Sequence, residues 1–238
     1  MTTVVISQPM FFPWIGMFEQ IRHADIFVHY TDVHFSKGSF TNRVQVRTSA
    51  GTGWLTVPLE HSNLGTEILE TRINYREAWQ RKHLATLKQS YARGKFTADM
   101  IALVESVYGH RDETIAGLAI RGMEAVCAYY GLQQGRKFVL SPELEIEGSG
   151  SPRVLEIVKR LEGTVYVTGH GARDYLDHEA FERCRIEVRY MDYRKTPYPQ
   201  LHGEFTPYVT VLDLIANTGL AGREFISSGT THWRDFVK

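Results

Sequence analysis

The sequence lacks an excess of charge of either sign. Its 238 residues include 27 Lys and Arg against 27 Asp and Glu, so the formal net charge is zero. Proteins that attract nucleic acid or anionic membrane surfaces usually carry a basic excess. The balanced charge therefore indicates neither partner, and we expect no nucleic acid and no membrane.

Long apolar runs and cysteines are also scarce. No run approaches the ~20 residues that a membrane-spanning helix needs, and the N-terminus lacks the basic-then-apolar pattern of a secretory signal. The two cysteines, Cys127 and Cys184, have no motif spacing, which is typical of a reducing compartment. These features favour a cytoplasmic protein.

Several catalytic signatures are missing as well. There is no G-x-S-x-G elbow, Walker loop, complete dinucleotide fingerprint or H-E-x-x-H pair, although the chain has ten histidines. We therefore expect no metal site and no tightly bound cofactor. Function must come from polar residues that stand beside core segments.

The first fifth of the chain, from Val4 to Trp54, has the most such residues. The β-branched run at 3–7 predicts a buried strand, and an aromatic turn then leads into a helix at 15–21. Polar groups at the carboxyl end of a strand, just before a helix, are where open α/β sheets bind ligands. Gln8 and Trp14 are therefore candidate ligand contacts, although core packing is the commoner role of an aromatic residue.

A second strand is predicted at 24–30, and a polar segment follows it. This segment carries Asp32 and Lys37, and Asn42 and Arg43 stand at its end. Basic side chains beside Asp and Asn suit a phosphate or carboxylate ligand. A surface salt-bridge cluster is the alternative, and it is the commoner outcome for a single charged pair.

Apolar alternation after this segment predicts a β-hairpin over 42–56 that turns at 49–53. A short strand is predicted at 68–73, with Asn74 as a helix cap. Helical periodicity then predicts a helical block over 78–131, ended by Gly131. Its three helices are expected at 78–91, 97–107 and 113–130.

His83 lies in the first of these helices, next to Lys82 and one turn from Trp79. An imidazole titrates near neutral pH, so it can accept a proton from an ammonium or hydroxyl group. His83 is therefore a candidate general base. A packed or solvated histidine is the alternative.

The second half of the chain resumes α/β alternation. Strands are predicted at 138–140, 164–168 and 186–193, the last half-exposed at an edge, and helices at 154–161, capped by Ser151, and 210–217. The tail at 226–238 is predicted as a loop with a short helix. We therefore expect an α/β fold with a mixed or mostly parallel sheet, flanking helices and the helical insert, in one domain over 1–238.

The glycine-rich stretch at 169–172 follows a predicted strand and precedes a predicted helix. Gly169 can then help to hold an anion through backbone N–H groups, although a plain tight turn fits equally well. The hydroxyl of Tyr175 can reach a substrate, and a buried anchor is its alternative role. Asp213 stands in an apolar helix, where a carboxylate needs a partner.

Four blocks of the sequence resemble the WbqC-like protein family. The first combines Q-P-x-x-F-P-W-I-G-x-F, D-x-F-V-x-x-x-D-V-x-F-S-K-x-S-F-x-N-R and G-x-x-W-L-T-V-P. The others are W-Q-R-K-H-L-A-T-L-K-Q-S-Y at 79–91, Y-V-T-G-H-G-A-R-D-Y-L-D at 166–177 and Y-P-Q-L-H-G-E-F-T-P-Y-V-T-V-L-D-L-I-A-N-T-G at 198–219. That family is associated with bacterial O-antigen and other polysaccharide loci.

The resemblance implies an amide-forming acyl- or aminoacyl-transferase that acts on an amino-sugar nucleotide. An acyl-CoA or a thioester on a carrier protein would be the co-substrate, and a homodimer is compatible with this reading. The implied catalytic residues are His83 as base, Lys37 and Asp32. The implied substrate-binding residues are Gln8, Trp14, Asn42, Arg43, Lys82, Tyr91, Gly169, Tyr175 and Gln200, and we expect the four blocks to meet in one pocket.

Two alternatives remain open. The first strand with Q-P-x-x-F-P-W-x-G, together with I-S-S-G-T at 226–230, resembles the nucleotide-binding loop and terminal serine motif of nucleotidyltransferases that use ATP. The H-x-G-H motif of that fold is missing here. The second alternative is a non-enzymatic binding module in a glycan or secondary-metabolite pathway.

Overall fold

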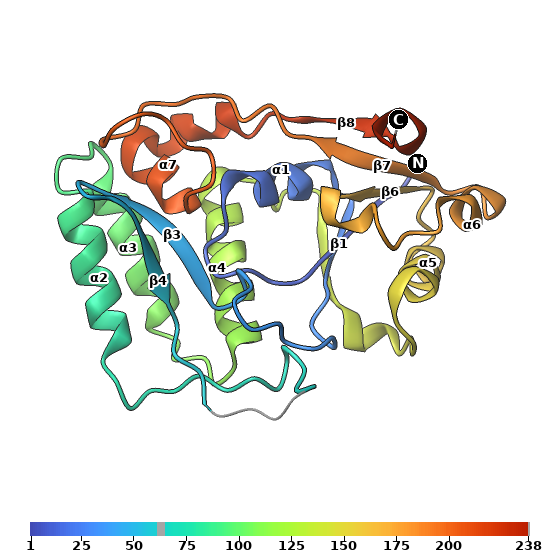
Figure 1. The fold of residues 1–238 in the computed structure, drawn as a ribbon, viewed down its shortest axis with the longest axis horizontal. Coiled ribbons are helices and arrows are strands. Elements are labelled where there is room, and N and C mark those ends of the chain that lie inside the picture. Colours follow the sequence, from blue (N-terminus) through green and yellow to red (C-terminus); the bar gives the residue numbers. More distant parts are fainter. Residues whose placement is uncertain (61–64, 238) are drawn as a thin grey trace.

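A six-stranded sheet forms the centre of the structure (Figure 1). The computed structural model describes residues 1–60 and 65–237. The strand order is β5-β2-β1-β6-β7-β8, and every neighbouring pair is parallel except β7 and β8. The predicted α/β fold with a mostly parallel sheet is confirmed. The strands are β1 (Thr3–Ser7), β2 (Ile26–His29), β5 (Lys137–Leu140), β6 (Val165–Thr168), β7 (Glu187–Asp192) and β8 (Gly229–His232).

The order of the strands reverses beside β1. From β1 the chain moves outward to β2 and β5, and it then returns to β6 and continues outward to β7. The connections that follow β1 and β6 therefore lead in opposite directions, although the two strands are neighbours. Open α/β sheets bind ligands outside the carboxyl ends of their strands at such a switch point.

Different helices cover the two faces of the sheet. Helices α1 (Ile15–His23) and α4 (Ile115–Tyr130) pack on one face, and α5 (Gly150–Arg160) and α6 (His178–Arg183) pack on the other. Successive side chains of a strand point to opposite faces. Accordingly, Val5 belongs to the first apolar cluster, whereas Val4 and Ile6 belong to the second. A sheet covered on both faces explains the uninterrupted apolar run of β1.

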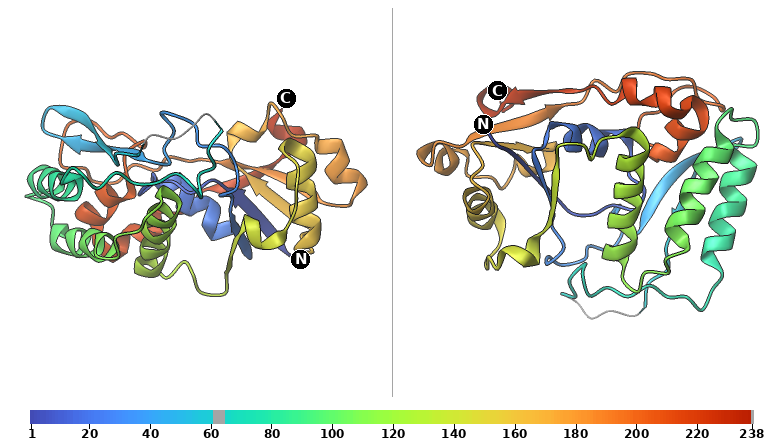
Figure 2. Two further views of the ribbon diagram at one scale, coloured as in Figure 1. Left: turned by 90° about the horizontal axis from the view of Figure 1, so that it is seen from below. Right: turned by 180° about the vertical axis from the view of Figure 1, so that it is seen from behind.

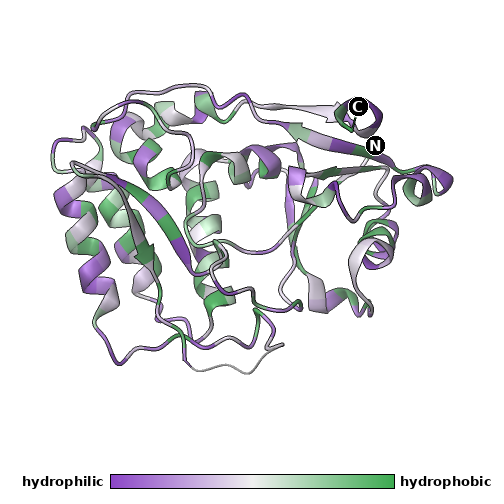
Figure 3. Ribbon diagram, viewed as in Figure 1, coloured by the Kyte–Doolittle hydropathy of each residue, from purple (hydrophilic) through white to green (hydrophobic). Residues whose placement is uncertain are grey.

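The predicted helical block is confirmed as α2 (Trp79–Ser90), α3 (Thr97–Tyr108) and α4. Gly131 ends α4 in the left-handed conformation, with φ 65°. Figure 2 shows that this block, the hairpin and α7 (Val211–Thr218) form one end of the molecule, while α5 and α6 form the other. Buried residues of α2 recur at helical spacing, and its mixed hydropathy is visible in Figure 3.

The predicted hairpin is also confirmed. Its strands β3 (Arg43–Thr48) and β4 (Gly51–Thr56) form a separate antiparallel pair that packs against α2. Among the described residues, no helix has both the length and the apolar character needed to cross a bilayer. Short helices complete the structure at Ser141–Leu144, His170–Ala172, Gly219–Phe225 and Trp233–Phe236, the last being α8.

The predicted strand at 68–73 is wrong, because this stretch forms a turn. The Thr71 amide and hydroxyl both donate hydrogen bonds to the Glu67 carbonyl, at 3.0 and 2.8 Å, and this curls the chain. Asn74 does not cap α2, which begins further along the chain. Its side chain instead accepts a hydrogen bond from the Arg76 amide at 2.9 Å.

The prediction of an edge strand at 186–193 is wrong as well. β7 lies inside the sheet, where Val188, Tyr190 and Met191 are buried and β8 pairs with it on its outer side. β8 comes from the tail at 226–238, which was predicted as a loop with a short helix. Its sequence, G-T-T-H, has no apolar alternation, so the strand depends on backbone pairing with β7.

The cap predicted for α5 is off by two residues. Ser149 occupies the N-cap position and the helix begins at Gly150, so Ser151 lies inside the first turn. The Ser151 hydroxyl instead accepts a hydrogen bond from the Asp177 amide at 2.8 Å. This contact ties the start of α5 to the start of α6.

Candidate functional site

A cavity of about 500 Å³ lies at the switch point of the sheet. Its volume falls within the range of roughly 300–1,000 Å³ that is usual for small-molecule sites. The carboxyl ends of β1 and β6 both contribute to its wall. The lining residues are Ile6, Ser7, Gln8, Met10, Gln20, Tyr30, Val33, Ser149, Gly150, Val154, Tyr166, Thr168, Gly169, Gly171, Ala172 and Tyr175.

The stretch after β6 was predicted to lead through the glycines into a helix, but no α-helix follows it directly. It forms a single 3₁₀ turn over 170–172, and α6 starts only at His178. Gly169 is tightly enclosed there, because a Cβ atom at this position would lie 3.3 Å from the Tyr193 hydroxyl and 3.4 Å from Gln20 Nε2. The Gln20 amide donates a hydrogen bond to that hydroxyl at 2.7 Å. This pair fixes the wall of the cavity behind Gly169.

The amino end of α5 lines the cavity instead. Ser149 and Gly150 contribute to the wall, and the Ser149 side chain makes no capping hydrogen bond. Gly148 and Gly150 have φ values of 98° and 61°, a backbone conformation that glycine adopts without strain. The first N–H groups of a helix carry a partial positive charge. This end of the cavity is therefore suited to a negatively charged group.

The described residues that line the cavity are uncharged and offer hydroxyl and amide groups. Burial raises the pKa of both Tyr30 and Tyr175. Their phenol groups therefore stay protonated at neutral pH and can donate hydrogen bonds. Ser7, Gln8 and Thr168 add groups that can both donate and accept. Such a lining suits sugar hydroxyls and the polar edges of a nucleoside.

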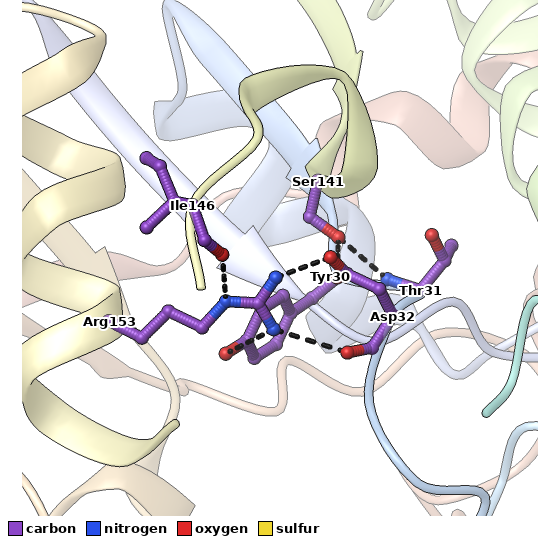
Figure 4. A network of polar contacts seen from close by, with 6 residues as sticks. All are labelled: Tyr30, Thr31, Asp32, Ser141, Ile146 and Arg153. Carbon is purple, nitrogen blue, oxygen red and sulfur yellow. Dashed lines mark hydrogen bonds and ion pairs between the residues drawn. The ribbon is translucent and has the colours of Figure 1, made fainter. Parts of the chain in front are cut away.

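A buried ion pair between Arg153 and Asp32 supports one wall (Figure 4). The Arg153 guanidinium donates to the Asp32 carboxylate, to the Asp32 carbonyl at 3.1 Å and to the Ile146 carbonyl at 2.8 Å. The Ser141 hydroxyl donates to the same carboxylate. Arg153 also lies over the ring of Tyr30, with 5.0 Å between its Cζ atom and the ring centroid. The ion pair therefore joins α5 to the end of β2.

Asp32, predicted as catalytic, thus lies beside the cavity and is engaged in this ion pair. Among the other predicted residues, Gln8, Gly169 and Tyr175 line the cavity directly. Trp14 lines a second cavity of about 200 Å³, which shares Met10 with the first. The first and third sequence blocks therefore meet at the switch point.

His83 lies in the helical block and lines neither cavity. Its Nε2 atom is 3.1 Å from the Thr56 carbonyl and its Nδ1 atom is 3.0 Å from the Tyr108 hydroxyl. Burial lowers the pKa of His83 to about 4, although the hydrogen bond to Thr56 opposes this shift. The neutral ring therefore donates to the carbonyl and accepts from Tyr108. In this position it joins α2, α3 and β4.

The remaining predicted residues also lie outside the first cavity. Lys82 is exposed and pairs with Glu77 at 2.9 Å. Lys37 is exposed, and the Asn42 amide donates to the Val57 carbonyl at 3.0 Å. Arg43 lies over the ring of Trp54, with 4.3 Å between its Cζ atom and the ring centroid.

Tyr91 and Gln200 lie together around the buried carboxyl of Asp213. Burial raises the pKa of Asp213, and the neighbouring polar groups of Tyr198, Tyr91 and Gln200 oppose this shift. The Asn217 amide donates to Asp213 Oδ1 at 3.3 Å, whereas Oδ2 has no hydrogen-bond partner among the described residues. This cluster holds α7 against the hairpin end of the molecule.

The prediction that all four blocks meet in one pocket is wrong. The second block, at 79–91, packs against α3 and β3, and its residues line neither of these two cavities. Together with Leu201 and His202 of the fourth block, it lines a separate cavity of about 370 Å³. The fourth block reaches the second cavity through Tyr208. Gln20 and Thr168 also line the cavity at the switch point, although neither was predicted as a site residue. Thr168 stands at the end of a predicted strand, and Gln20 is a polar residue in an apolar helix. Both features can indicate a ligand-binding residue.

Comparisons with known proteins confirm the resemblance to the WbqC-like protein family. The sequence model of the WbqC-like protein family matches residues 8–224. An uncharacterized protein of Mycobacterium tuberculosis, Rv1507c, is 30% identical over 229 residues, which cover 95% of this chain and 98% of that protein. No solved structure matches the chain significantly.

Proposed function

Because the chain belongs to the WbqC-like protein family, we propose that it binds an amino-sugar nucleotide in the switch-point cavity and acylates the amine of the sugar. The observation that carries this proposal is the position of the cavity. It opens where the chain reverses direction across a mostly parallel sheet, and its uncharged lining combines hydroxyl and amide groups with apolar side chains. Open α/β sheets that bind nucleotides hold them in this place.

The parts of a sugar nucleotide match the parts of the cavity. Ser7, Gln8 and Thr168 offer donors and acceptors for hydroxyl groups of the sugar or the ribose. The amino end of α5, at Ser149 and Gly150, offers backbone N–H groups to the diphosphate. The family's association with polysaccharide loci supports a sugar as the acceptor.

The proposed reaction needs no side chain of the cavity to keep the proton that the amine loses. The amine nitrogen attacks the carbonyl carbon of an acyl thioester, a C–N bond forms and the C–S bond breaks. The proton lost by the nitrogen leaves with the sulfur as a thiol. The protein then acts mainly by holding amine and thioester in reacting geometry, which can lower a barrier by several kcal/mol (roughly 7–11 at best). This scheme assigns no step to His83.

Binding is tested by isothermal titration with a panel of UDP-, dTDP- and GDP-linked amino sugars. We expect one member to bind, and Gln8→Ala and Thr168→Val each to weaken it by about three- to tenfold, since each removes one neutral hydrogen bond. Lys82→Ala is the matched control, because its side chain is exposed on α2 and does not line the cavity. The proposal fails if no member of the panel binds, or if both cavity variants bind like the wild type.

Acylation is tested by adding acetyl-CoA to the complex. We expect equal amounts of free thiol, measured with a thiol reagent, and of N-acyl sugar nucleotide, measured by mass spectrometry. Thiol released without the N-acyl product would indicate plain hydrolysis and would contradict the transfer.

A nucleotidyltransferase-like activity is the second candidate, and one observation favours it. The I-S-S-G-T motif packs against α1, because the Ser228 amide and hydroxyl donate to Glu19 Oε1 at 3.0 and 2.6 Å. The two motifs that resemble such enzymes thus lie on the same side of the sheet. Trp14 and Met17 stand where H-x-G-H would have its histidines. Binding of ATP with release of diphosphate would favour this candidate over the transferase.

A further inference from the structure

A second cavity adjoins the first and differs from it in character. It has a volume of about 200 Å³, and the described residues that line it are apolar or aromatic. They come from the segment before α1, from the segment before β3, from β3 and from the loop before α7. The lining residues are Met10, Pro13, Trp14, Phe40, Val44 and Tyr208.

The aromatic side chains around this cavity are exposed to an unusual degree. Phe40, Trp54 and Tyr208 are 48%, 45% and 52% exposed. Their rings form contacts with one another and with Trp14: the ring centroids of Phe40 and Trp54 are 6.0 Å apart, and those of Trp14 and Tyr208 are 5.8 Å apart. Exposed aromatic residues gathered at one place usually mark a binding site.

Two cations lie on the rim of this aromatic group. Arg43 lies over Trp54, and Lys195 lies 4.9 Å from the centroid of the Tyr208 ring and donates to its hydroxyl at 2.6 Å. Within residues 1–60 and 65–237, neither cation forms an ion pair with a carboxylate. Both charges are therefore available to an anionic ligand.

Met10 connects the two cavities because its side chain lines both of them. A molecule in the apolar cavity would thus reach the edge of the switch-point cavity. Trp14 also packs against Tyr193, with 4.9 Å between ring centroids, and Tyr193 borders Gly169 in the first cavity. The two cavities therefore share one partition.

We propose that the apolar cavity at Trp14, Phe40 and Tyr208 binds the acyl group of a phosphopantetheine thioester, and that Arg43 and Lys195 bind its phosphate. This inference rests on the proposed function and assigns a binding site to its acyl donor. The thioester carbonyl then lies at Met10, beside the amine of the sugar. Transfer forms the C–N bond, breaks the C–S bond and releases the thiol with the proton of the amine.

The size of the cavity restricts the acyl group. A dry protein cavity of ~150 Å³ binds benzene, so a cavity of about 200 Å³ accommodates a short aliphatic or a benzoyl group. Each methylene buried in it should strengthen binding by about fourfold. Affinity is therefore expected to rise from acetyl to butanoyl and to stop rising once the cavity is full.

The test is a titration of the protein with acetyl-, butanoyl-, hexanoyl- and benzoyl-CoA, followed by tryptophan fluorescence. In Val44→Phe the added ring fills the cavity, so the gain from acetyl to butanoyl should disappear while acetyl-CoA still binds. Val44 is buried, so the larger phenylalanine can also disturb folding. Tyr208 is half exposed, and Tyr208→Ala therefore provides a second variant that does not disturb the core. Loss of that ring contact should weaken butanoyl-CoA by about two- to tenfold.

The charge contribution is tested with the double variant Arg43→Gln, Lys195→Gln. It should weaken every acyl-CoA by the same factor and reduce the dependence on salt. Lys82→Gln removes an exposed cation elsewhere and is the matched control. Titration of the sugar nucleotide on the same preparations should give unchanged affinities.

The outcomes separate the inference from the proposed function. A chain-length series that is identical in the wild type, Val44→Phe and Tyr208→Ala overturns the inference, even when the sugar nucleotide binds. A response to these variants without any sugar-nucleotide binding supports the apolar site and refutes the proposed acceptor. Binding of butanoyl carrier protein but not of butanoyl-CoA identifies the carrier as the source of the thioester, and binding of neither overturns the inference.

Discussion

Replacing Asp32 with alanine leaves the Arg153 guanidinium buried without its carboxylate partner. The Arg153 side chain is 6% exposed, whereas that of Asp32 is 18% exposed. Removing one member of a buried ion pair usually costs about 3–5 kcal/mol. Arg153 keeps its hydrogen bonds to the carbonyls of Ile146 and residue 32. We therefore expect the lower end of that range, about 3 kcal/mol, for Asp32→Ala.

The opposite replacement should cost less. Arg153→Met keeps most of the packing volume and leaves the Asp32 carboxylate with the Ser141 hydroxyl and with access to water. Because that carboxylate can be hydrated, we expect a cost of about 2 kcal/mol. The double variant should be more stable than the sum of the two losses predicts, since it leaves no unpaired charge.

Chemical denaturation of the four proteins measures these differences. In a chain of this size, a loss of 3 kcal/mol corresponds to a fall in Tm of about 6–12 °C. The variants should also weaken ligands that reach the amino end of α5, since the ion pair holds this helix against β2. Two results would refute the claim that the Arg153–Asp32 ion pair stabilises the cavity wall. One is equal stability of Asp32→Ala and the wild type, and the other is a loss in the double variant equal to the sum of the two single losses.

Three further predictions concern groups that line neither the switch-point cavity nor the apolar cavity. Burial lowers the pKa of His83 to about 4. Below pH ~6.5 the unfolded chain therefore takes up a proton that the folded chain does not. The free energy of unfolding should fall by about 3 kcal/mol as the pH drops from 7 to 4. His83→Gln should remove that dependence in denaturation curves and leave sugar-nucleotide binding intact; retention of the full pH dependence would contradict the assignment. The buried Thr210 hydroxyl donates to the Phe12 carbonyl at 2.7 Å, so Thr210→Val should cost about 1–3 kcal/mol, and a neutral substitution would show that the bond is dispensable. Burial raises the pKa of Cys127 to about 12. A thiol reagent should therefore modify only the exposed Cys184 in the native protein, and both cysteines after denaturation. Rapid modification of Cys127 in the native protein would contradict its burial.

Helices and strands with a clear hydrophobic pattern in their own sequence could be predicted. The β-branched run of β1 and the helical periodicity of α2, α3 and α4 suffice, because each pattern matches a single kind of buried face. Gly131 likewise fixes the end of α4. The strand β8 could not be predicted in the same way, because G-T-T-H becomes a strand only when β7 provides its backbone partners.

The candidate site was predicted in part, for a similar reason. The position of Gln8 after a strand and before a helix places it at the carboxyl edge of the sheet in any α/β fold. Gly169 follows from the same argument. His83 has a chemically versatile side chain, and only tertiary packing reveals that Thr56 and Tyr108 occupy both of its ring nitrogens. Spacing along a helix does not reveal which neighbouring element that face meets.

A crystal structure of the protein with a bound amino-sugar nucleotide tests the central claim most directly. The proposed function predicts density for the sugar within hydrogen-bonding distance of Gln8 or Thr168, and the diphosphate at the amino end of α5. The amine should point toward Met10 and the apolar cavity. A nucleotide bound beside His83 and Lys82, with the switch-point cavity empty, would contradict the account.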